Sequence, residues 1–167
     1  EGDDYPARIY ITFEYDPSKL SFFEKAKYKT IKLLYGQYPP LAAINYIWES
    51  KAPVGTMVPN PYTDRVMMFV VESGEAKLNQ WVVEERNIYE DYKKAFGEEP
   101  PMISGVAIMT DTDNTGESAT AYYGDILFKK WTFTLSVSRC WLPSWKSDFQ
   151  ISPPDTTFQV VIDKIKF

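Results

Sequence analysis

The stretch that decides the fold class reads Arg8-Ile9-Tyr10-Ile11-Thr12-Phe13-Glu14-Tyr15. Apolar side chains alternate here with polar or amphipathic ones, and a period of two is typical of a strand that buries one face. Working outward from it, we expect further strands over residues 41–49, 65–73, 80–85, 102–109, 119–128, 132–137 and 158–162. Residues 50–64 are rich in Pro, Gly and Asn, so we expect a loop there.

Two short helices are expected in the connections between strands. Ser21 and Glu24 have the spacing of a capping box, and Gly36 is placed to end the first helix. Asn87 and Glu90 have the same spacing at the start of the second helix, which Gly97 ends. The inward faces are predicted to be Phe23, Ala26, Thr30, Ile31 and Leu34 in the first helix, and Ile88, Tyr92, Ala95 and Phe96 in the second.

The composition supports this β-rich interpretation. The chain has 167 residues, 44% of them hydrophobic and 16% aromatic, which suits one domain over residues 1–167 with a core of its own. Aromatic residues favour strands because their rings pack well on a pleated surface. We therefore expect an all-β (β-dominated) fold, an antiparallel, jelly-roll-like β-sandwich with two short helices inserted in its connections.

Charge and composition also exclude several functions. The net charge of −5 argues against a nucleic-acid partner, although Lys25, Lys27, Lys29 and Lys32 cluster in what we interpret as a solvated helix face. Because histidine is absent, Ser-His-Asp catalysis and imidazole metal sites are excluded. Cys140 is the lone cysteine, so no intrachain disulfide can form. No apolar run has the length of a membrane span.

The best candidate for chemistry is the segment 111–116, Asp-Thr-Asp-Asn-Thr-Gly. Calcium prefers oxygen ligands, and closely spaced carboxylate and amide oxygens in a tight loop can converge on one ion. The predicted metal ligands are Asp111, Asp113, Asn114 and the more distant Asp125, with the pair Asp3 and Asp4 as another donor. The alternative is an Asx-rich turn without a cation, in which these side chains bond their own backbone.

Flat aromatic rings supply a second candidate site. A sugar packs its C–H face on such a ring, while nearby polar groups fix its orientation. The predicted ligand-binding residues are Trp48, Trp81, Tyr122, Trp141, Trp145 and Arg86. Tyr122 and Tyr123 are neighbours on an expected strand, so at most one of them faces any one site. The alternative is that these rings belong to the core.

Four segments together resemble a known family. They are residues 2–8 (Gly-Asp-Asp-Tyr-Pro-Ala-Arg), residues 40–48, residues 81–91 and residues 108–126, the last containing Thr-Asp-Thr-Asp-Asn-Thr-Gly-Glu-Ser-Ala and Ala-Tyr-Tyr-Gly-Asp-Ile. In this order they resemble the uncharacterised bacterial family catalogued as domain of unknown function 3047, over about residues 1–130. The resemblance implies that the domain is truncated at its N-terminus, and it leaves residues 131–167 as an atypical C-terminal segment.

The resemblance also implies an exported protein, periplasmic or extracellular, with a jelly-roll sandwich similar to those of lectins and carbohydrate-binding modules. We expect a non-catalytic module with calcium as a structural cofactor and a glycan or an envelope protein as partner. One alternative is a carbohydrate-active enzyme on the same fold, a glycoside hydrolase or a polysaccharide lyase; no catalytic residues stand out for it. A second alternative is a structural or assembly module of the cell envelope. Ligand identity and oligomeric state stay open.

Overall fold

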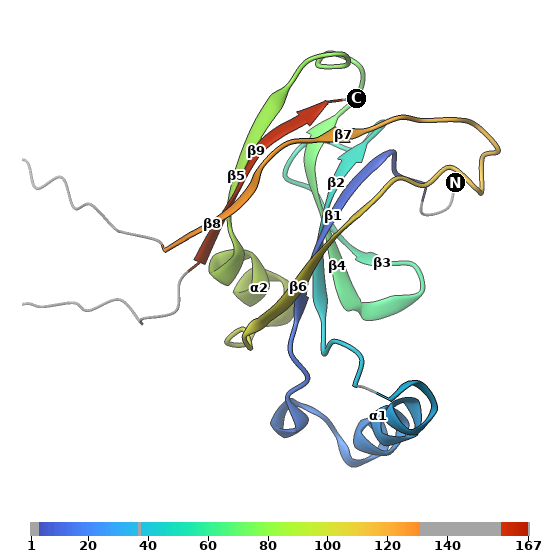
Figure 1. Ribbon diagram of the computed structural model, residues 1–167, viewed down its shortest axis with the longest axis vertical. Coiled ribbons are helices and arrows are strands. Elements are labelled where there is room, and N and C mark those ends of the chain that lie inside the picture. The colour runs from blue at the N-terminus through green and yellow to red at the C-terminus, as the bar shows by residue number, and fades with distance from the viewer. Residues whose placement is uncertain (1–3, 37, 131–157, 167) are drawn as a thin grey trace, which may run out of the picture.

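The computed structural model describes residues 4–36, 38–130 and 158–166, and Figure 1 shows their arrangement. Strands predominate, as the composition predicts. The elements are β1 (Ala7–Phe13), a 3₁₀ turn (Pro17–Lys19), α1 (Phe22–Tyr35), β2 (Ala43–Glu49), β3 (Met57–Asn60), β4 (Thr63–Ser73), β5 (Val82–Asn87), α2 (Ile88–Phe96), β6 (Ile103–Met109), β7 (Tyr122–Tyr123), β8 (Ile126–Lys130) and β9 (Phe158–Lys166).

A five-stranded sheet forms the larger part of the fold, in the order β3-β4-β2-β1-β6. The pairs β1–β2, β1–β6 and β3–β4 are antiparallel, but β2 and β4 run parallel. The sheet is therefore mixed, and the expectation of a purely antiparallel fold was wrong. The expectation of a loop over residues 50–64 was also wrong, because β3 forms there despite Pro59. A proline is tolerated in β3 because this strand lies at the edge of the sheet.

A second sheet is built around β9, which pairs antiparallel with β5, β7 and β8. The strand expected over residues 119–128 consists of two pieces, β7 and β8, separated by Gly124 and Asp125. The strand expected over residues 132–137 lies outside the described residues.

The main core lies between the first sheet and a layer made of the second sheet and α2. The alternation that decides the fold class is confirmed, because Ile9, Ile11 and Phe13 are fully buried on one face of β1. From the opposite layer, Val82 of β5 and Tyr92 of α2 belong to the same cluster. The two sheets and α2 can be followed in Figure 1.

Helix α2 confirms its sequence prediction. The side chain of Asn87 accepts a hydrogen bond from the Glu90 amide, which satisfies a backbone donor of the first turn. Ile88 and Tyr92 are buried, and Phe96 packs against the core cluster.

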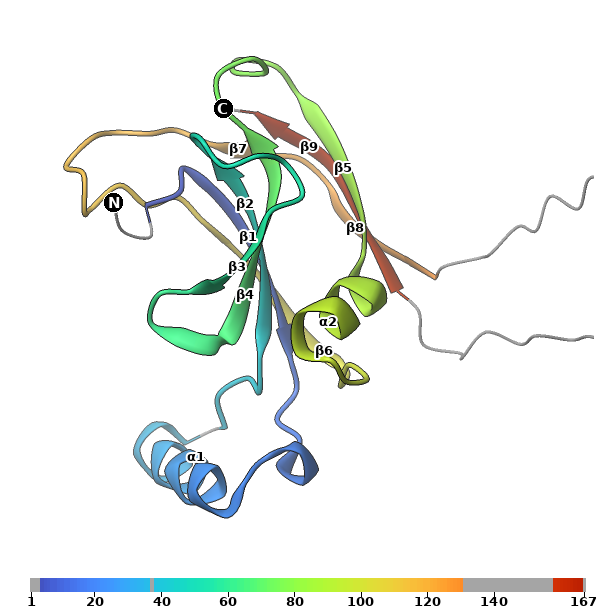
Figure 2. The same cartoon turned by 180° about the vertical axis from the view of Figure 1, so that it is seen from behind.

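The ends of helix α1 lie where the sequence predicts them, but its predicted buried face does not. Both hydrogen bonds of the capping box form between Ser21 and Glu24, and Gly36 closes the helix in the left-handed conformation (φ 79°). The predicted inward face is wrong for four of its five residues: Phe23 is 84% and Leu34 is 71% exposed, Ala26 and Thr30 are also exposed, and Ile31 alone of the five is half-buried. The physical reason is that α1 lies at one end of the molecule and does not cover the face of either sheet (Figure 2).

Candidate functional site

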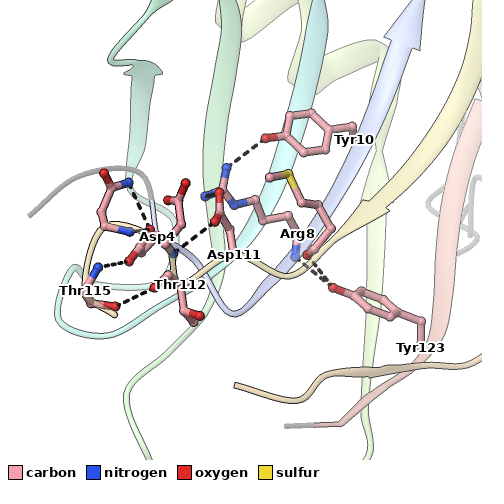
Figure 3. A network of polar contacts seen from close by, with 10 residues as sticks. Asp4, Arg8, Tyr10, Asp111, Thr112, Thr115 and Tyr123 are labelled. Atoms are coloured by element: carbon pink, nitrogen blue, oxygen red, sulfur yellow. Dashed lines mark hydrogen bonds and ion pairs between the residues drawn. The ribbon is translucent and has the colours of Figure 1, made fainter. Parts of the chain in front are cut away.

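The candidate site joins the start of β1 to the loop that follows β6 (Figure 3). Asp4 lies just before β1, and its carboxylate spans the gap to the loop. One oxygen of Asp4 accepts hydrogen bonds from the backbone amide (3.2 Å) and the side-chain amide (3.1 Å) of Asn114. The other oxygen accepts a hydrogen bond from the Thr115 amide at 2.7 Å. Two segments about 110 residues apart in the chain are thus held together through one side chain.

The buried side chain of Arg8 holds the loop to β1 through Asp111. Its side chain is only 1% exposed, and its guanidinium donates to Asp111 at 3.2 Å and to the Tyr10 hydroxyl at 3.1 Å. The ring of Tyr5 lies 5.1 Å from the guanidinium, a cation–π distance. The Tyr123 hydroxyl accepts from the Arg8 amide, so β7 is fixed to the same strand. A buried charge needs such partners, and Arg8 therefore defines the position of Asp111.

The loop itself is closed by short-range hydrogen bonds. The Thr112 hydroxyl donates to the Glu117 carbonyl at 2.8 Å, and the Gly116 amide donates to the Thr112 carbonyl at 3.0 Å. Gly116 has φ 68°, which strains any residue with a Cβ. The Asp113 amide donates to Asp111 at 3.4 Å, as in an Asx turn. The tight turn that the sequence predicts is therefore present, with a glycine where the sharp bend falls.

Three carboxylates converge at this turn. Asp4, Asp111 and Asp113 each place an oxygen within 4.8 Å of the others. The guanidinium of Arg8 forms an ion pair with Asp111, one of the three carboxylates. Partial desolvation opposes ionisation of Asp4, but hydrogen bonds from Thr115 and Asn114 outweigh it and lower the pKa from 3.8 to about 2. Carboxylate oxygens gathered in this way are the type of ligand that a hard divalent cation prefers.

The predicted metal ligands are brought together in part. Asp111 and Asp113 belong to the cluster of three carboxylates. Asn114 lies in the same turn but uses its side-chain amide to donate to Asp4. Asp125 follows β7, is exposed, and does not belong to the cluster. Asp4 joins the cluster as the N-terminal donor that the sequence suggested, while Asp3 lies outside the described residues.

The predicted ligand-binding rings have different environments. Trp48 is only 4% exposed and its indole N–H donates to the Gly74 carbonyl, so this ring belongs to the core. Trp81 and Tyr122 are 50% and 55% exposed. Tyr123 packs against the core, which confirms that the two adjacent tyrosines face opposite sides. Trp141 and Trp145 lie outside the described residues.

Trp81 and Tyr122 share one side of the second sheet. Val82 and Tyr123 both align with Ile165 of β9 and both contact the core. Their exposed neighbours Trp81 and Tyr122 therefore project from the opposite, outer face, with β9 between them. Two strand spacings place the backbones of the two residues about 10 Å apart. This outer face therefore carries two exposed aromatic rings.

Arg86 and the acids near it form a network between the two layers. Arg86 donates to both oxygens of Asp91, at 3.0 and 2.7 Å, and the Tyr46 hydroxyl donates to Asp91 at 2.8 Å. This pairing fixes α2 to β5 and leaves Arg86 engaged within the protein. Burial and the charge of Asp91 raise the pKa of Tyr46 well above its usual value.

Glu72 of β4 and Glu84 of β5 form a pair of carboxyl groups that was not predicted from the sequence. Glu72 is 5% exposed and pairs with Lys77. Burial, followed by a hydrogen bond and charge repulsion from Glu72, raises the pKa of Glu84 from 4.5 to about 7. The available signal was an acid at the end of the apolar run Met68–Val71, where a strand covered on both faces rarely carries a charge.

The fold and the site define a β-dominated protein with a mixed sheet and a carboxylate cluster at its rim. No helix in the described part of the chain is long and apolar enough to cross a bilayer. The family described as "Protein of unknown function (DUF3047)" matches residues 1–127, and the chain belongs to this family. Searches of the curated proteins and of the solved structures gave no match.

Proposed function

We propose that the protein is a non-catalytic, exported β-sandwich module that binds a glycan and is stabilised by a structural calcium ion. The observation that carries the calcium part of the proposal is the convergence of Asp4, Asp111 and Asp113 within 4.8 Å. Calcium takes six to eight oxygen ligands, so the ion completes its shell with backbone carbonyls and water. Bound there, it ties the segment before β1 to the loop after β6.

The glycan lies across the outer face of the second sheet. Trp81 and Tyr122 expose about half of their surface on this face, at a separation that lets two rings contact one extended chain. Glu85, also exposed, follows on the same strand and offers oxygen acceptors for sugar hydroxyls. Arg86, engaged with Asp91, supports this face from the inside.

The carboxyl groups of the protein fit a glycan-binding function better than a glycoside hydrolase. A glycoside hydrolase needs a general acid whose pKa is raised, opposite a second carboxylate across the substrate. Among the described carboxyl groups with a shifted pKa, Glu84 alone shows a rise, and its side chain faces the layer between the sheets. The binding function therefore accounts for more of the described residues than the enzyme does.

A glycan array, probed with the protein in calcium and again in EDTA, tests this proposal. We expect binding in calcium, loss of binding in Trp81→Ala and Tyr122→Ala, and weaker binding in EDTA. Tyr62→Ala is the matched control, because Tyr62 is 74% exposed but lies in the turn between β3 and β4. Absence of glycan binding in both conditions, or equal binding by Trp81→Ala and the native protein, contradicts the proposal.

A further inference from the structure

Helix α1 presents an apolar face to solvent. Phe22, Phe23, Leu33 and Leu34 are 80%, 84%, 86% and 71% exposed. At 3.6 residues per turn these four side chains fall within one third of the helix circumference, together with the exposed Ala26. Large apolar side chains gathered on one exposed face mark a surface that binds a partner.

Lysines border this face on both sides. Helical geometry places Lys25, Lys29 and Lys32 along one edge of the apolar face and Lys27 along the other. The one acid of the helix, Glu24, is paired with Arg65 of β4 and so does not offset the lysines. The helix is therefore locally cationic in a chain whose net charge is −5.

The rest of the protein holds α1 with its apolar face outward. On the side opposite this face, the Tyr28 hydroxyl donates to the carbonyls of Pro40 and Leu41, and Glu24 pairs with Arg65. Figure 2 shows α1 at one end of the molecule. Beside the apolar face lies a groove of about 520 Å³ lined by Tyr15, Pro17, Phe22, Lys25, Ala26, Lys29 and Tyr38.

We propose that α1 docks the protein on a membrane surface that contains anionic lipids. Apolar side chains flanked by lysines are the pattern of a helix that lies in the plane of the interface, with its rings below the headgroups. The lysine stems extend toward the lipid phosphates while their methylene groups cover apolar surface. With 14 residues, α1 is shorter than the roughly 20 that a membrane span needs, so it lies along the surface.

Charge complementarity selects this partner over a protein groove or a second copy of the chain. A second copy brings four lysines against four lysines when the two apolar faces meet. An apolar groove on another protein explains the phenylalanines and leucines but not the cationic edges on both sides. An anionic lipid surface satisfies both features at once, and it does so without requiring calcium or a glycan.

Vesicle co-sedimentation of the full chain tests the proposal. The vesicles contain equal parts of phosphatidylglycerol and phosphatidylcholine, or phosphatidylcholine alone. We expect binding to the first that weakens as salt is added, and weak binding to the second. Phe23→Ser is expected to lower the partition coefficient about tenfold or more, and Lys27→Gln to lower it about fivefold. Leu127→Ser is the matched control, since Leu127 is 45% exposed on β8, outside α1.

Three results overturn the proposal. The first is an absence of binding to anionic vesicles by protein whose circular dichroism and melting temperature are native. The second is an equal loss of binding in Leu127→Ser and Phe23→Ser. The third is a concentration-dependent dimer in sedimentation equilibrium that Phe23→Ser dissociates, because a second copy then covers the face. The variants lie at exposed positions, so native melting of each variant shows that any loss of binding does not arise from unfolding.

Discussion

Replacing Glu84 with Gln is expected to remove much of the dependence of stability on pH between about 4.5 and 7. Burial and the neighbouring Glu72 raise the pKa of Glu84 from 4.5 to about 7 in the folded protein. Because the folded state binds this proton more tightly than the unfolded state, the contribution is fully present below the unfolded pKa. It is lost as the pH rises through the folded pKa.

The size of the effect follows from that shift. At about 1.4 kcal/mol per pKa unit, the shift corresponds to an upper bound of about 3–4 kcal/mol. Glu84 is partly exposed, so solvent screening reduces the expected effect to about 1–2 kcal/mol. The Gln side chain keeps a neutral hydrogen-bonding group beside Glu72. Glu84→Gln should therefore be more stable than the native protein by this amount at pH 8, and about equally stable near pH 4.5.

Urea unfolding at intervals between pH 4.5 and 8 measures this difference. Glu85→Gln is the matched control, because Glu85 is the next residue on β5 but is exposed on the other face. A native-like pH profile in Glu84→Gln refutes the reasoning. So does an equal change in Glu85→Gln, because the cause would then be the loss of a surface charge.

Three further substitutions test the packing that positions the site. Tyr46→Phe removes the buried hydrogen bond to Asp91 and should cost about 1–2 kcal/mol in urea unfolding; an unchanged midpoint contradicts the network. Asn87→Ala removes the cap of α2 and should cost about 1 kcal/mol, with Asn60→Ala at the end of β3 as the comparison. Ile11→Ala leaves a cavity in the core and should cost about 2–5 kcal/mol in thermal or urea unfolding, whereas a cost below that of Asn87→Ala argues against the observed core.

Local signals predicted much of the fold correctly. The alternation of Ile9, Ile11 and Phe13, the capping box of Ser21 and Glu24, and the cap at Asn87 all depend on residues close in the chain. Strand pairing depends on distant residues, so the parallel pair β2–β4 had no signature in either strand alone. Strand β3 was missed because Pro59 suggests a loop, and only its place at the sheet edge makes the proline acceptable.

For the candidate site too, the sequence predicted the residues that are close in the chain but not those that distant strand pairing brings together. Asp111 and Asp113 are close in sequence, and their spacing predicted convergence. Asp4 and Arg8 reach the loop only because β1 pairs with β6, which aligns Arg8 with Met109. The exposed face of α1 could not be predicted, since an amphipathic pattern shows that a helix has an apolar face but not what covers it.

Calcium binding by Asp4, Asp111 and Asp113 is the central claim, and calorimetric titration of chelator-treated protein tests it most directly. Asp113→Asn removes a charge from the cluster, and Asp64→Asn, at an exposed position on β4, is the control. We predict saturable heat for the native protein and for Asp64→Asn, with binding lost or strongly weakened in Asp113→Asn. No saturable heat in the native protein, or an unchanged isotherm in Asp113→Asn, contradicts the claim.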